Sequence, residues 1–361
     1  MPQQILVIGA GLIGAALGFR LSQAGAQVTL IDMGAIGGAT SARSFGWINA
    51  NAPDTPEYFA LRCEALAAWR RLDAELGGIG LSGQGTLTWY AGDWSTEAEI
   101  AAVTRHGPYA ARVVDRDEFA RLEPALADPP EVSVLTSDET ALDGRAAAER
   151  LVAEAARLGA RVLNGAAVEG LVEEGGRITG ARTGFGTLRA DHVVLATGTA
   201  TGRILEGLGI RLPMDNRPGF ILHSRPVAPV LNHILLTPEV HLRQEPDGRI
   251  VAGEVFFGEG PNSAEMTTDP LGFGDRLLAA MRVRLPGVAI EPLRAMLGTR
   301  PMPADGFPAV GEVAPGLSVV TTHSGVTLSA ILAESLAAEI LRGEAQPLLA
   351  PYRPGRFDGW T

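Results

Sequence analysis

Three glycines near the start of the chain have the spacing of a phosphate-binding loop. Gly9, Gly11 and Gly14 directly follow the short apolar run 5–8 and precede a stretch with helical spacing of apolar residues. Glycine at these places permits a tight turn, lets the backbone approach a pyrophosphate, and lets the helix pack on the strand. The positive end of the helix would then face the phosphates. The pattern predicts a bound dinucleotide.

An acidic residue ends the strand that follows this helix. Residues 28–31 form a second apolar run, and Asp32 comes directly after it. A carboxylate in this place accepts hydrogen bonds from ribose hydroxyls and disfavours a 2′-phosphate, so NADP is not expected. The motif does not distinguish FAD from NAD.

Polar residues with different chemistry follow the ribose carboxylate. Thr40, Ser41 and Arg43 come soon after a Gly-Gly turn and offer two hydroxyls and one guanidinium. They could surround a second phosphate or the flavin end of a long dinucleotide. The alternative is a polar surface loop.

An arginine near residue 300 is suited to grip a carboxylate. Pro301 keeps Arg300 out of helical geometry and so fixes where its side chain points. A guanidinium held in this way can bind a carboxylate with two hydrogen bonds. The alternative is a structural pair between Arg300 and Asp305, and the residues alone favour neither.

A strand end, a glycine turn and a helix start meet at 323–328. The sequence there is His323-Ser324-Gly325-Val326-Thr327-Leu328. The positive end of such a helix would stabilise negative charge on a reduced flavin. The alternative is an ordinary helix capped by Ser324 or Thr327.

The elements that position these residues follow two patterns. Strand and helix signals of α/β type occur at 146–158, 161–163, 193–196, 317–321 and 326–341, and strands joined by turns are expected at 85–91, 218–227, 233–244 and 249–257. Asp247-Gly248 is a hairpin signal. Because the patterns interleave, we expect two discontinuous domains: 1–80, 141–212 and 299–361 for the dinucleotide, and 81–140 with 213–298 for the substrate.

Composition excludes several other classes of protein. The 361 residues carry a net charge of -11 without a basic block, which argues against nucleic acid as a partner. The single cysteine, Cys63, cannot form an internal disulfide or a metal cluster, and we expect a buried structural thiol. No leader precedes the first apolar run and no run of about 18 apolar residues is present, so no transmembrane segment and a cytoplasmic location are expected.

Taken together, the segments resemble the D-amino-acid oxidase, glycine oxidase and sarcosine oxidase superfamily of FAD-dependent oxidoreductases. The resemblance runs in order along nearly the whole chain, through the glycine loop, Thr40-Ser41, 193–198, Arg300-Pro301 with 305–308, and 323–328. It implies a Rossmann-like FAD-binding domain with a doubly wound parallel sheet. It also implies a substrate domain built on a large antiparallel sheet.

The resemblance also implies roles for particular residues. Arg300 would anchor the substrate carboxylate, residues 325–328 would lie along the flavin pyrimidine edge, and the backbone of Val168 would contact the adenine. The full set expected to bind FAD is Gly9, Gly11, Leu12, Ile13, Gly14, Asp32, Met33, Thr40, Ser41, Arg43, Val168, Thr197, Gly198, Gly298, Gly325, Val326, Thr327 and Leu328. Because the early loop has no histidine and Cys63 does not match a flavin attachment site, FAD is expected to be noncovalent, with His323 the less favoured exception.

The expected reaction is oxidation of a C–N bond. A small amino acid or secondary amine (a D-amino acid, glycine, sarcosine or a cyclic imino acid) would pass hydride to flavin N5, and the imine formed would hydrolyse. Arg300 and His323 are the catalytic candidates, and Trp47, Tyr90, His223 and His241 are candidates for the pocket beside Arg300. Oxygen or a quinone would reoxidise the flavin, and the chain could be a homo-oligomer. The alternatives are a nicotinamide-dependent dehydrogenase and a flavin-binding subunit of a hetero-oligomeric amine dehydrogenase.

Overall fold

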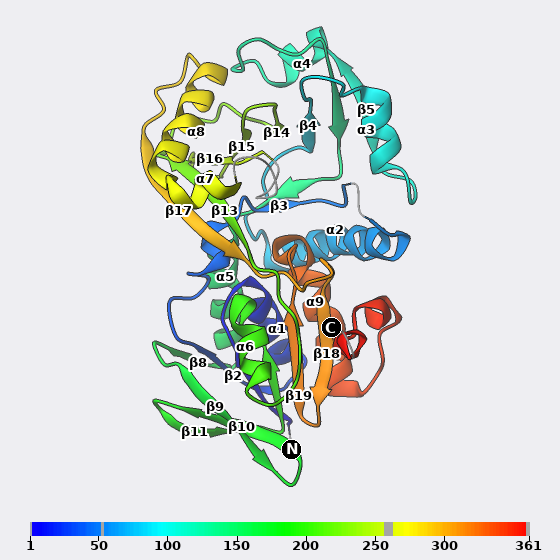
Figure 1. The fold of residues 1–361 in the computed structure, drawn as a ribbon, viewed down its shortest axis with the longest axis vertical. Helices are drawn as coiled ribbons and strands as arrows, with labels where there is room; N and C mark the ends of the chain where they lie inside the picture. The colour runs from blue at the N-terminus through cyan, green and yellow to red at the C-terminus, as the bar shows by residue number, and fades with distance from the viewer. Residues whose placement is uncertain (1, 52–53, 256–262, 359–361) are drawn as a thin grey trace. The chain divides into compact units, whose positions relative to one another are not determined.

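The computed structural model describes residues 2–51, 54–255 and 263–358, and it divides the chain into two compact units. Unit 1 consists of 1–42, 144–217 and 299–361, and unit 2 consists of 43–143 and 218–298. Each unit is therefore discontinuous, as the interleaved patterns predict. Figure 1 shows the elements of both units with the labels used below.

The unit boundaries differ from the predicted domain boundaries. Residues 43–80 and 141–143, assigned from the sequence to the dinucleotide domain, belong to unit 2, whereas 213–217 belong to unit 1. The long helix α2 (Pro56–Leu76) explains most of the difference. Its Phe59 ring meets Tyr109 edge-on, and its Arg70 pairs with Asp138, so packing within unit 2 holds this helix. A helical pattern alone does not show which domain a helix packs against.

Unit 1 is built on a six-stranded sheet with the order β18-β19-β12-β1-β2-β8. The strands are β1 (Gln4–Ile8), β2 (Gln27–Asp32), β8 (Arg161–Asn164), β12 (His192–Leu195), β18 (Ala309–Ala314) and β19 (Leu317–Thr321). All neighbours are parallel except β18, which runs antiparallel to β19. The central strand β1 is almost wholly buried and apolar, as a parallel strand covered on both faces requires.

Helices complete unit 1. They are α1 (Leu12–Gln23), α5 (Gly144–Arg157), α6 (Thr201–Glu206) and α9 (Gly325–Arg342), with short 3₁₀ turns at η1 (Thr40–Arg43), η2 (Gly198–Ala200), η3 (Pro347–Tyr352) and η4 (Pro354–Phe357). Helix α1 packs against both α5 and α9. A separate antiparallel sheet of β9 (Val168–Glu174), β10 (Arg177–Thr183) and β11 (Gly186–Arg189) was not predicted.

Unit 2 is built on an eight-stranded sheet with the order β17-β13-β16-β15-β14-β4-β6-β5. The strands are β4 (Thr86–Thr88), β5 (Ala111–Asp115), β6 (Val132–Thr136), β13 (Arg217–Ser224), β14 (Ile234–Leu236), β15 (His241–Gln244), β16 (Ile250–Gly253) and β17 (Pro292–Arg300). The predicted single strand 233–244 is two strands, and residues 256–257 of the predicted strand 249–257 lie outside the described residues. Strand β4 runs parallel to β14, so the sheet is antiparallel with one parallel pair recorded.

The remaining elements of unit 2 are a small two-stranded pairing and four short or medium helices. Strand β3 (Trp47–Ile48) pairs with β7 (Thr140–Ala141). The helices, besides α2, are α3 (Thr96–Val103), α4 (Arg116–Leu122), α7 (Ser263–Thr268) and α8 (Pro270–Arg284).

The two faces of the large sheet of unit 2 differ in chemistry. One face carries Phe220, Leu222, Leu242, Ile250 and Ala252, which belong to an apolar core that also takes in residues of α8. Side chains alternate along a strand, so their neighbours project from the opposite face. That opposite face presents Thr86, Thr88, His223, His241 and Arg243, all of them buried. Burying so many polar groups is costly unless they are hydrogen-bonded or serve a ligand.

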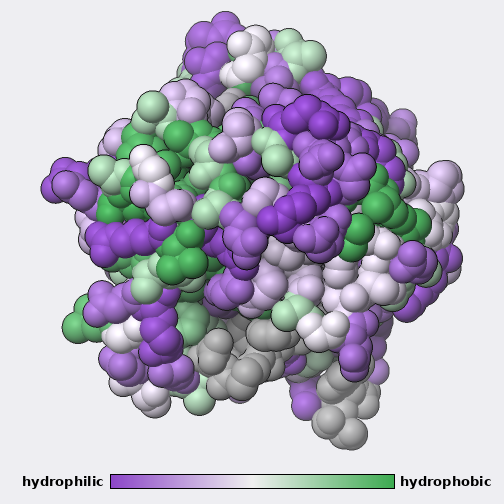
Figure 2. Space-filling view, turned by 90° about the horizontal axis from the view of Figure 1, so that it is seen from above, coloured by the Kyte–Doolittle hydropathy of each residue, from purple (hydrophilic) through white to green (hydrophobic). Residues whose placement is uncertain are grey.

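The structure also bears on the exclusions made from composition. Within the described residues, no helix is long and apolar enough to cross a membrane, and no group of histidine, cysteine, aspartate and glutamate could hold a metal ion. Figure 2 shows separate hydrophobic areas among hydrophilic ones on the face that it views. Cys63, predicted to be buried, is only half-buried on α2, and burial raises the pKa of its thiol.

Candidate functional site

The backbone path of the loop between β1 and α1 requires glycine at two positions. Gly9 has a φ of 103°, and a Cβ there would lie 2.3 Å from the carbonyl oxygen of Ala196. A Cβ on Gly14 would lie 1.9 Å from the Gly9 carbonyl oxygen. Both contacts are far inside van der Waals distance, so any side chain would force strand, loop and helix apart.

Gly11 has a different reason to be glycine. A Cβ there would meet Ser41 Oγ at 3.5 Å, an ordinary contact, and its φ of -64° suits any residue. The folded chain therefore does not need glycine at this position. Its missing side chain instead leaves the N-terminal end of α1 open, as close approach of a pyrophosphate to the backbone demands.

Asp32 secures the loop as well as offering acceptors to a ligand. Its two carboxylate oxygens accept hydrogen bonds from the backbone N–H of Ala10 (2.7 Å) and of Gly34 (2.8 Å). Each oxygen has a second lone pair, so the predicted bonds from ribose hydroxyls remain possible. Met33 follows Asp32 directly in the chain, and 76% of its surface is exposed.

The hydroxyls of η1 support the same loop. Ser41 Oγ accepts a hydrogen bond from the Leu12 N–H (3.0 Å), and Thr40 Oγ1 donates to the Thr299 carbonyl (2.8 Å). The hydroxyl proton of Ser41 is therefore directed elsewhere, because the oxygen uses a lone pair for Leu12. Arg43, the last residue of η1, is exposed and falls in unit 2.

Two helix N-termini lie next to each other in unit 1. A Cβ on Gly325, the first residue of α9, would lie 3.4 Å from the Ile13 side chain in the first turn of α1. The N-cap residue of α9 is Ser324, and its side chain makes no capping hydrogen bond, which is contrary to the alternative in which Ser324 caps the helix. Its hydroxyl instead lies 3.4 Å from His323 Nδ1. Residues Val326, Thr327 and Leu328 form the first turn.

The turn after β12 lies beside the glycine loop. The Ala196 carbonyl faces Gly9, and Gly198, with a φ of 54°, lies 3.9 Å (from its would-be Cβ) from Pro301. The hydroxyls of Thr197 and Thr201 are hydrogen-bonded to each other at 2.9 Å. The Arg300-Pro301 segment therefore reaches the turn that borders the glycine loop.

Two further residues expected to bind FAD lie elsewhere in the chain. Val168 is the first residue of β9 and is half-buried. Gly298 is buried near Arg43 within unit 2.

Asp305 has a different partner from the one considered in the sequence. Its two oxygens accept hydrogen bonds from Arg356 Nε (2.6 Å) and Nη2 (3.0 Å), and Arg356 also binds the Phe307 carbonyl. A bidentate guanidinium already neutralises this carboxylate. Arg300, at the end of β17, is half-buried.

The candidate pocket residues Tyr90, His241 and His223 of unit 2 make two separate sets of contacts. Tyr90 Oη lies 3.4 Å from His241 Nε2, and burial lowers the pKa of His241 to about 3 and raises the pKa of Tyr90. His223 Nδ1 faces guanidinium nitrogens of Arg249 (3.1 Å) and Arg294 (3.4 Å). Burial first, and then the charges of Arg294 and Arg249, lower the pKa of His223 to about 3. Both imidazoles are therefore neutral at pH 7.

Trp47 leads to a buried acid that the sequence analysis missed. Its Nε1–H donates to Glu139 Oε2 (2.8 Å) and to Thr86 Oγ1 (3.0 Å), and Tyr109 donates to Glu139 Oε1 (2.7 Å). Burial is the main reason why the pKa of Glu139 rises to about 7, although these hydrogen bonds lower it. No sequence pattern marks Glu139, which lies between strands.

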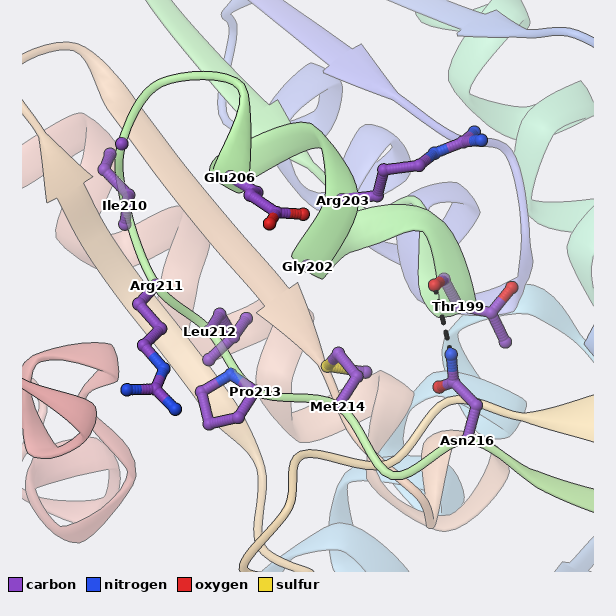
Figure 3. A pocket seen from close by; sticks show the side chains of 11 residues that line it. Thr199, Gly202, Arg203, Glu206, Ile210, Arg211, Leu212, Pro213, Met214 and Asn216 are labelled. Carbon is purple, nitrogen blue, oxygen red and sulfur yellow. Dashed lines mark hydrogen bonds between the residues drawn. The ribbon is translucent and has the colours of Figure 1, made fainter. Parts of the chain in front are cut away.

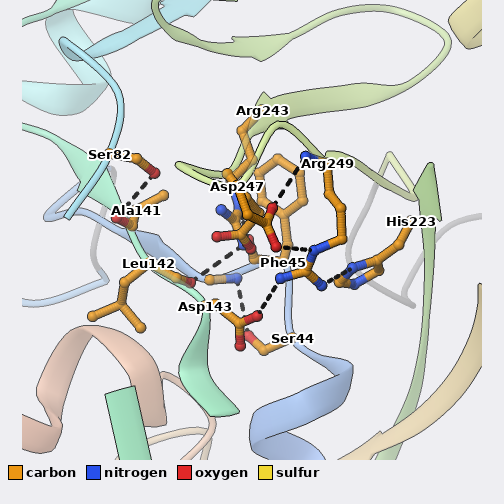
Figure 4. Close-up of polar contacts among 12 residues, drawn as sticks. Ser44, Phe45, Ser82, Ala141, Leu142, Asp143, His223, Arg243, Asp247 and Arg249 are labelled. Atoms are coloured by element: carbon orange, nitrogen blue, oxygen red, sulfur yellow. Dashed lines mark hydrogen bonds and ion pairs between the residues drawn. The ribbon is translucent and has the colours of Figure 1, made fainter. Parts of the chain in front are cut away.

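Arginines near His223 were also missed. Figure 4 shows Arg249 bound to Asp143 (2.9 Å), to Asp247 (2.6 Å) and to His223. Arg243 is buried beside Glu245 at 2.7 Å. The signal that could have found them is a charged residue at an inward position of a predicted strand.

The described surface of unit 1 also has an open pocket of about 560 Å³ beside α6. Figure 3 shows that Thr199, Arg203, Arg211 and Asn216 are among its lining side chains. It contains none of the predicted site residues.

The donor set of unit 1 fits FAD. An open glycine loop, a carboxylate with lone pairs to offer and two adjacent helix N-termini are all suited to an anionic dinucleotide.

Comparison with known proteins agrees with this class of site. Residues 4–339 match the model of the DAO family, described as FAD dependent oxidoreductase, so the chain belongs to this family. It is therefore an FAD-dependent oxidoreductase acting on amino acids or amines. The nicotinamide-dependent alternative was wrong, because the family is FAD-dependent.

Individual relatives are distant but cover nearly the whole chain. Glycine oxidase of Pseudomonas aeruginosa is 27% identical over 98% of this chain and 99% of its own. The chain spans about half the length (55%) of the bifunctional protein ThiO/ThiG of Nostoc, with 26% identity over 99% of this chain. The crystal structure of iminodiacetate oxidase from Chelativorans is 25% identical, with a TM-score of 0.82 over 97% of this chain and 98% of that one.

Proposed function

We propose that this chain oxidises the C–N bond of a small amino acid or secondary amine that carries a carboxylate. Bound FAD would accept the hydride from the carbon beside the nitrogen, and the imine product would hydrolyse in water. The candidate substrates are D-amino acids, glycine and its N-alkyl derivatives, and cyclic imino acids. Relatives named glycine oxidase and iminodiacetate oxidase support this class.

In this proposal unit 1 holds the cofactor without a covalent bond. The loop through Gly11 and the first turn of α1 bind the pyrophosphate, and Asp32 accepts hydrogen bonds from the ribose. The start of α9, at Gly325, favours the negative charge that FAD gains on reduction. The η1 segment, Thr40–Arg43, contains neither cysteine nor histidine that could attach the flavin.

Arg300 binds the substrate carboxylate in this proposal. The observation that carries it is the position of the Arg300-Pro301 segment beside Gly198, on the turn that borders the glycine loop. A guanidinium at this place can fix an amino acid by its carboxylate and so orient its C–H bond.

The remaining candidates orient the substrate rather than transfer protons. His223 and His241 are neutral at pH 7 and buried, so neither supplies a positive charge. We assign Trp47 and Tyr90 to the walls of the pocket and His323, at the start of α9, to the flavin side. Positioning and an amine presented without its proton suffice for hydride transfer.

The test begins with the visible spectrum of the purified protein. Flavin bands that bleach without oxygen on addition of one class of amine would identify cofactor and substrate class together. Bands that no amine bleaches would favour the flavin-binding subunit of a hetero-oligomer, and a colourless protein that takes up no FAD would contradict the proposal.

A variant separates the role of Arg300 from general damage. Arg300→Met should raise the KM for the bleaching amine by roughly a hundredfold, because a charged, two-point hydrogen bond is lost. Arg342→Gln, which removes an exposed arginine paired with Glu344, is the matched control and should leave KM unchanged. An unaltered KM in Arg300→Met would rule out the anchoring role.

A further inference from the structure

The pocket beside α6 has no role in the function proposed so far, and all of its lining residues belong to unit 1. Its volume of about 560 Å³ lies within the range of roughly 300–1,000 Å³ that is typical of pockets for small molecules. One wall is formed by η2 and α6, and the other by residues 210–216, which are called the wall segment below. Figure 3 shows the side chains of both walls.

The two walls touch at Gly202 of α6. A Cβ there would lie 2.8 Å from the Leu212 carbonyl oxygen and 2.9 Å from Met214 Cγ, so any side chain would push the walls apart. Leu212 is buried, and Ile210 and Met214 are half-buried while they line the pocket. The lining therefore includes an apolar surface that a ligand can cover.

Hydrogen bonds to residues outside the pocket hold the wall segment in place. The Ala304 N–H donates to the Pro213 carbonyl (3.0 Å), and the Asp215 N–H donates to the Met302 carbonyl (2.7 Å). The fixed φ of Pro213 restricts the segment further. The pocket is thus largely formed before a ligand arrives, which lowers the entropic cost of binding.

Two opposite charges of α6, Arg203 and Glu206, line the same pocket. They are three residues apart, a spacing at which opposite charges on a helix can pair. Within residues 2–51, 54–255 and 263–358, however, no ion pair or side-chain hydrogen bond joins the Arg203 guanidinium or the Glu206 carboxylate to another residue. Figure 3 shows the Arg203 side chain extending away from Glu206. Both charges thus remain available to a ligand.

The combination of these features distinguishes the pocket from ordinary surface. One exposed charge needs no explanation, because water solvates it. Here a positive and a negative side chain stand at one concave surface that also has apolar residues. Arg211 of the wall segment adds a second guanidinium to the lining. A ligand that matches all of these groups carries a carboxylate, an ammonium group and an apolar part.

We propose that this pocket binds a zwitterionic amino acid with an apolar side chain, at a site separate from the one assigned to Arg300. The carboxylate pairs with Arg203 and the ammonium group with Glu206. The apolar side chain lies against Ile210 and Met214. The inference does not depend on the proposed function, because binding here requires neither hydride transfer nor any residue of the proposed reaction site.

The first experiment measures binding of an amino acid that flavin cannot oxidise. The probe is 1-aminocyclopentanecarboxylate, which has an apolar ring and no C–H bond on the carbon that carries the nitrogen. Cyclopentanecarboxylate and cyclopentylamine each lack one of its two charges. In calorimetric titration of the FAD-loaded protein, the probe should bind about fivefold more tightly than either, the effect of one partly exposed charged contact. Equal binding of the probe and cyclopentanecarboxylate would contradict the zwitterionic class.

The same titration of FAD-loaded Arg300→Met separates the pocket from the proposed reaction site. Arg300 is assigned to the substrate carboxylate, so this variant loses amino acid binding there but should keep the binding at the pocket. Loss of all binding of the probe in Arg300→Met would mean that the amino acid occupies only the Arg300 site, and the inference would be wrong.

Two variants of α6 test the charges one at a time. Arg203→Gln should remove the preference for the probe over cyclopentylamine, because the carboxylate then gains nothing. Glu206→Gln should remove the preference over cyclopentanecarboxylate, because the ammonium group then has no partner. General damage to the fold would lower both preferences together and could not produce this exchange.

The matched control is another exposed arginine of unit 1. Arg157→Gln removes a guanidinium of α5 that pairs with Glu154, and it should bind the probe as the unaltered protein does. Selective loss in Arg203→Gln and Glu206→Gln, with Arg157→Gln unaffected, would support the site. Unchanged affinity for the probe in both variants of α6 would overturn it.

Discussion

Unit 1 and unit 2 both concentrate hydrogen-bond donors, but they do so with different parts of the chain. In unit 1 the means are backbone groups: an open turn at Gly11 and the adjacent N-termini of α1 and α9. In unit 2 the means are side chains, with arginines and histidines projecting from buried strands. Backbone donors need little compensation, whereas buried guanidiniums need carboxylates such as Glu245 and Asp143.

The comparison teaches how much each site can tolerate. A backbone site depends on the exact path of the chain, so a single added carbon can destroy it. A side-chain site can be altered by one group at a time, but each change leaves a partner charge buried. The predictions below test these two kinds of dependence, beginning with the largest expected effect.

The glycine loop offers a matched pair of substitutions. Gly9→Ala should destabilise the fold by more than about 3 kcal/mol, because its φ is 103° and the new Cβ would overlap the Ala196 carbonyl. Gly11→Ala should leave the stability of the FAD-free protein nearly unchanged, because its Cβ has room, yet should weaken FAD binding. Urea unfolding of the FAD-free protein and a flavin titration measure the two effects. Equal loss of stability in both variants would contradict the distinction between chain and ligand requirements.

The buried pair of unit 2 should be the next most sensitive point. Arg243→Met leaves the Glu245 carboxylate buried without its main partner, which costs about 3–5 kcal/mol. Arg243→Met combined with Glu245→Leu should recover much of this loss, because no charge is then stranded. Chemical denaturation of the three proteins tests it. A double variant no more stable than Arg243→Met would mean that the Arg243 contacts to Phe45 and Leu142, rather than charge, set the cost.

Glu139 should give unit 2 a dependence on pH. Its pKa is raised to about 7, mainly by burial, so the folded state favours the protonated acid. The stability from this group is complete below the unfolded pKa near 4.5 and is lost as pH rises through about 7, by about 3 kcal/mol. Glu139→Gln can keep hydrogen bonds to Trp47 and Tyr109 without titrating. Between pH 5 and about 8, the unfolding free energy of the unaltered protein should therefore fall relative to that of Glu139→Gln as pH rises. Two curves that stay parallel over this range would contradict the raised pKa.

The same contrast explains what could be predicted from the sequence. The turn at Gly9 was predicted, the strand predicted at 193–196 is observed at His192–Leu195, and the helix predicted from 326 begins at Gly325, because these elements depend on local patterns of glycine and apolar residues. The polar sheet face was predicted only in fragments, His223 and His241 among them. Its composition depends on strand register, which is set by pairing between residues far apart in the chain.

Other features needed information that a local pattern does not contain. The assignment of α2 to unit 2 rests on contacts of Phe59 and Arg70 with residues about 50 to 70 positions away. Glu139 is one of many acidic residues in the sequence, and only its burial among Trp47 and Tyr109 distinguishes it. The pair of Asp305 with Arg356 likewise joins residues 51 positions apart.

The smallest predicted effect concerns Ser41, a side chain that supports the backbone site of unit 1. Ser41 Oγ accepts from the Leu12 N–H at the first turn of α1, and Ser41→Ala removes that acceptor. The loss should be about 1 kcal/mol in stability, as for a lost capping bond, because the freed N–H can turn to water or to a phosphate. FAD affinity should then fall by less than about tenfold. Thr40→Val, which removes only the bond to the Thr299 carbonyl, is the matched control. A larger loss of FAD in Ser41→Ala than in Gly11→Ala would mean that the hydroxyl itself binds the cofactor, and unit 1 would then depend on side chains as unit 2 does.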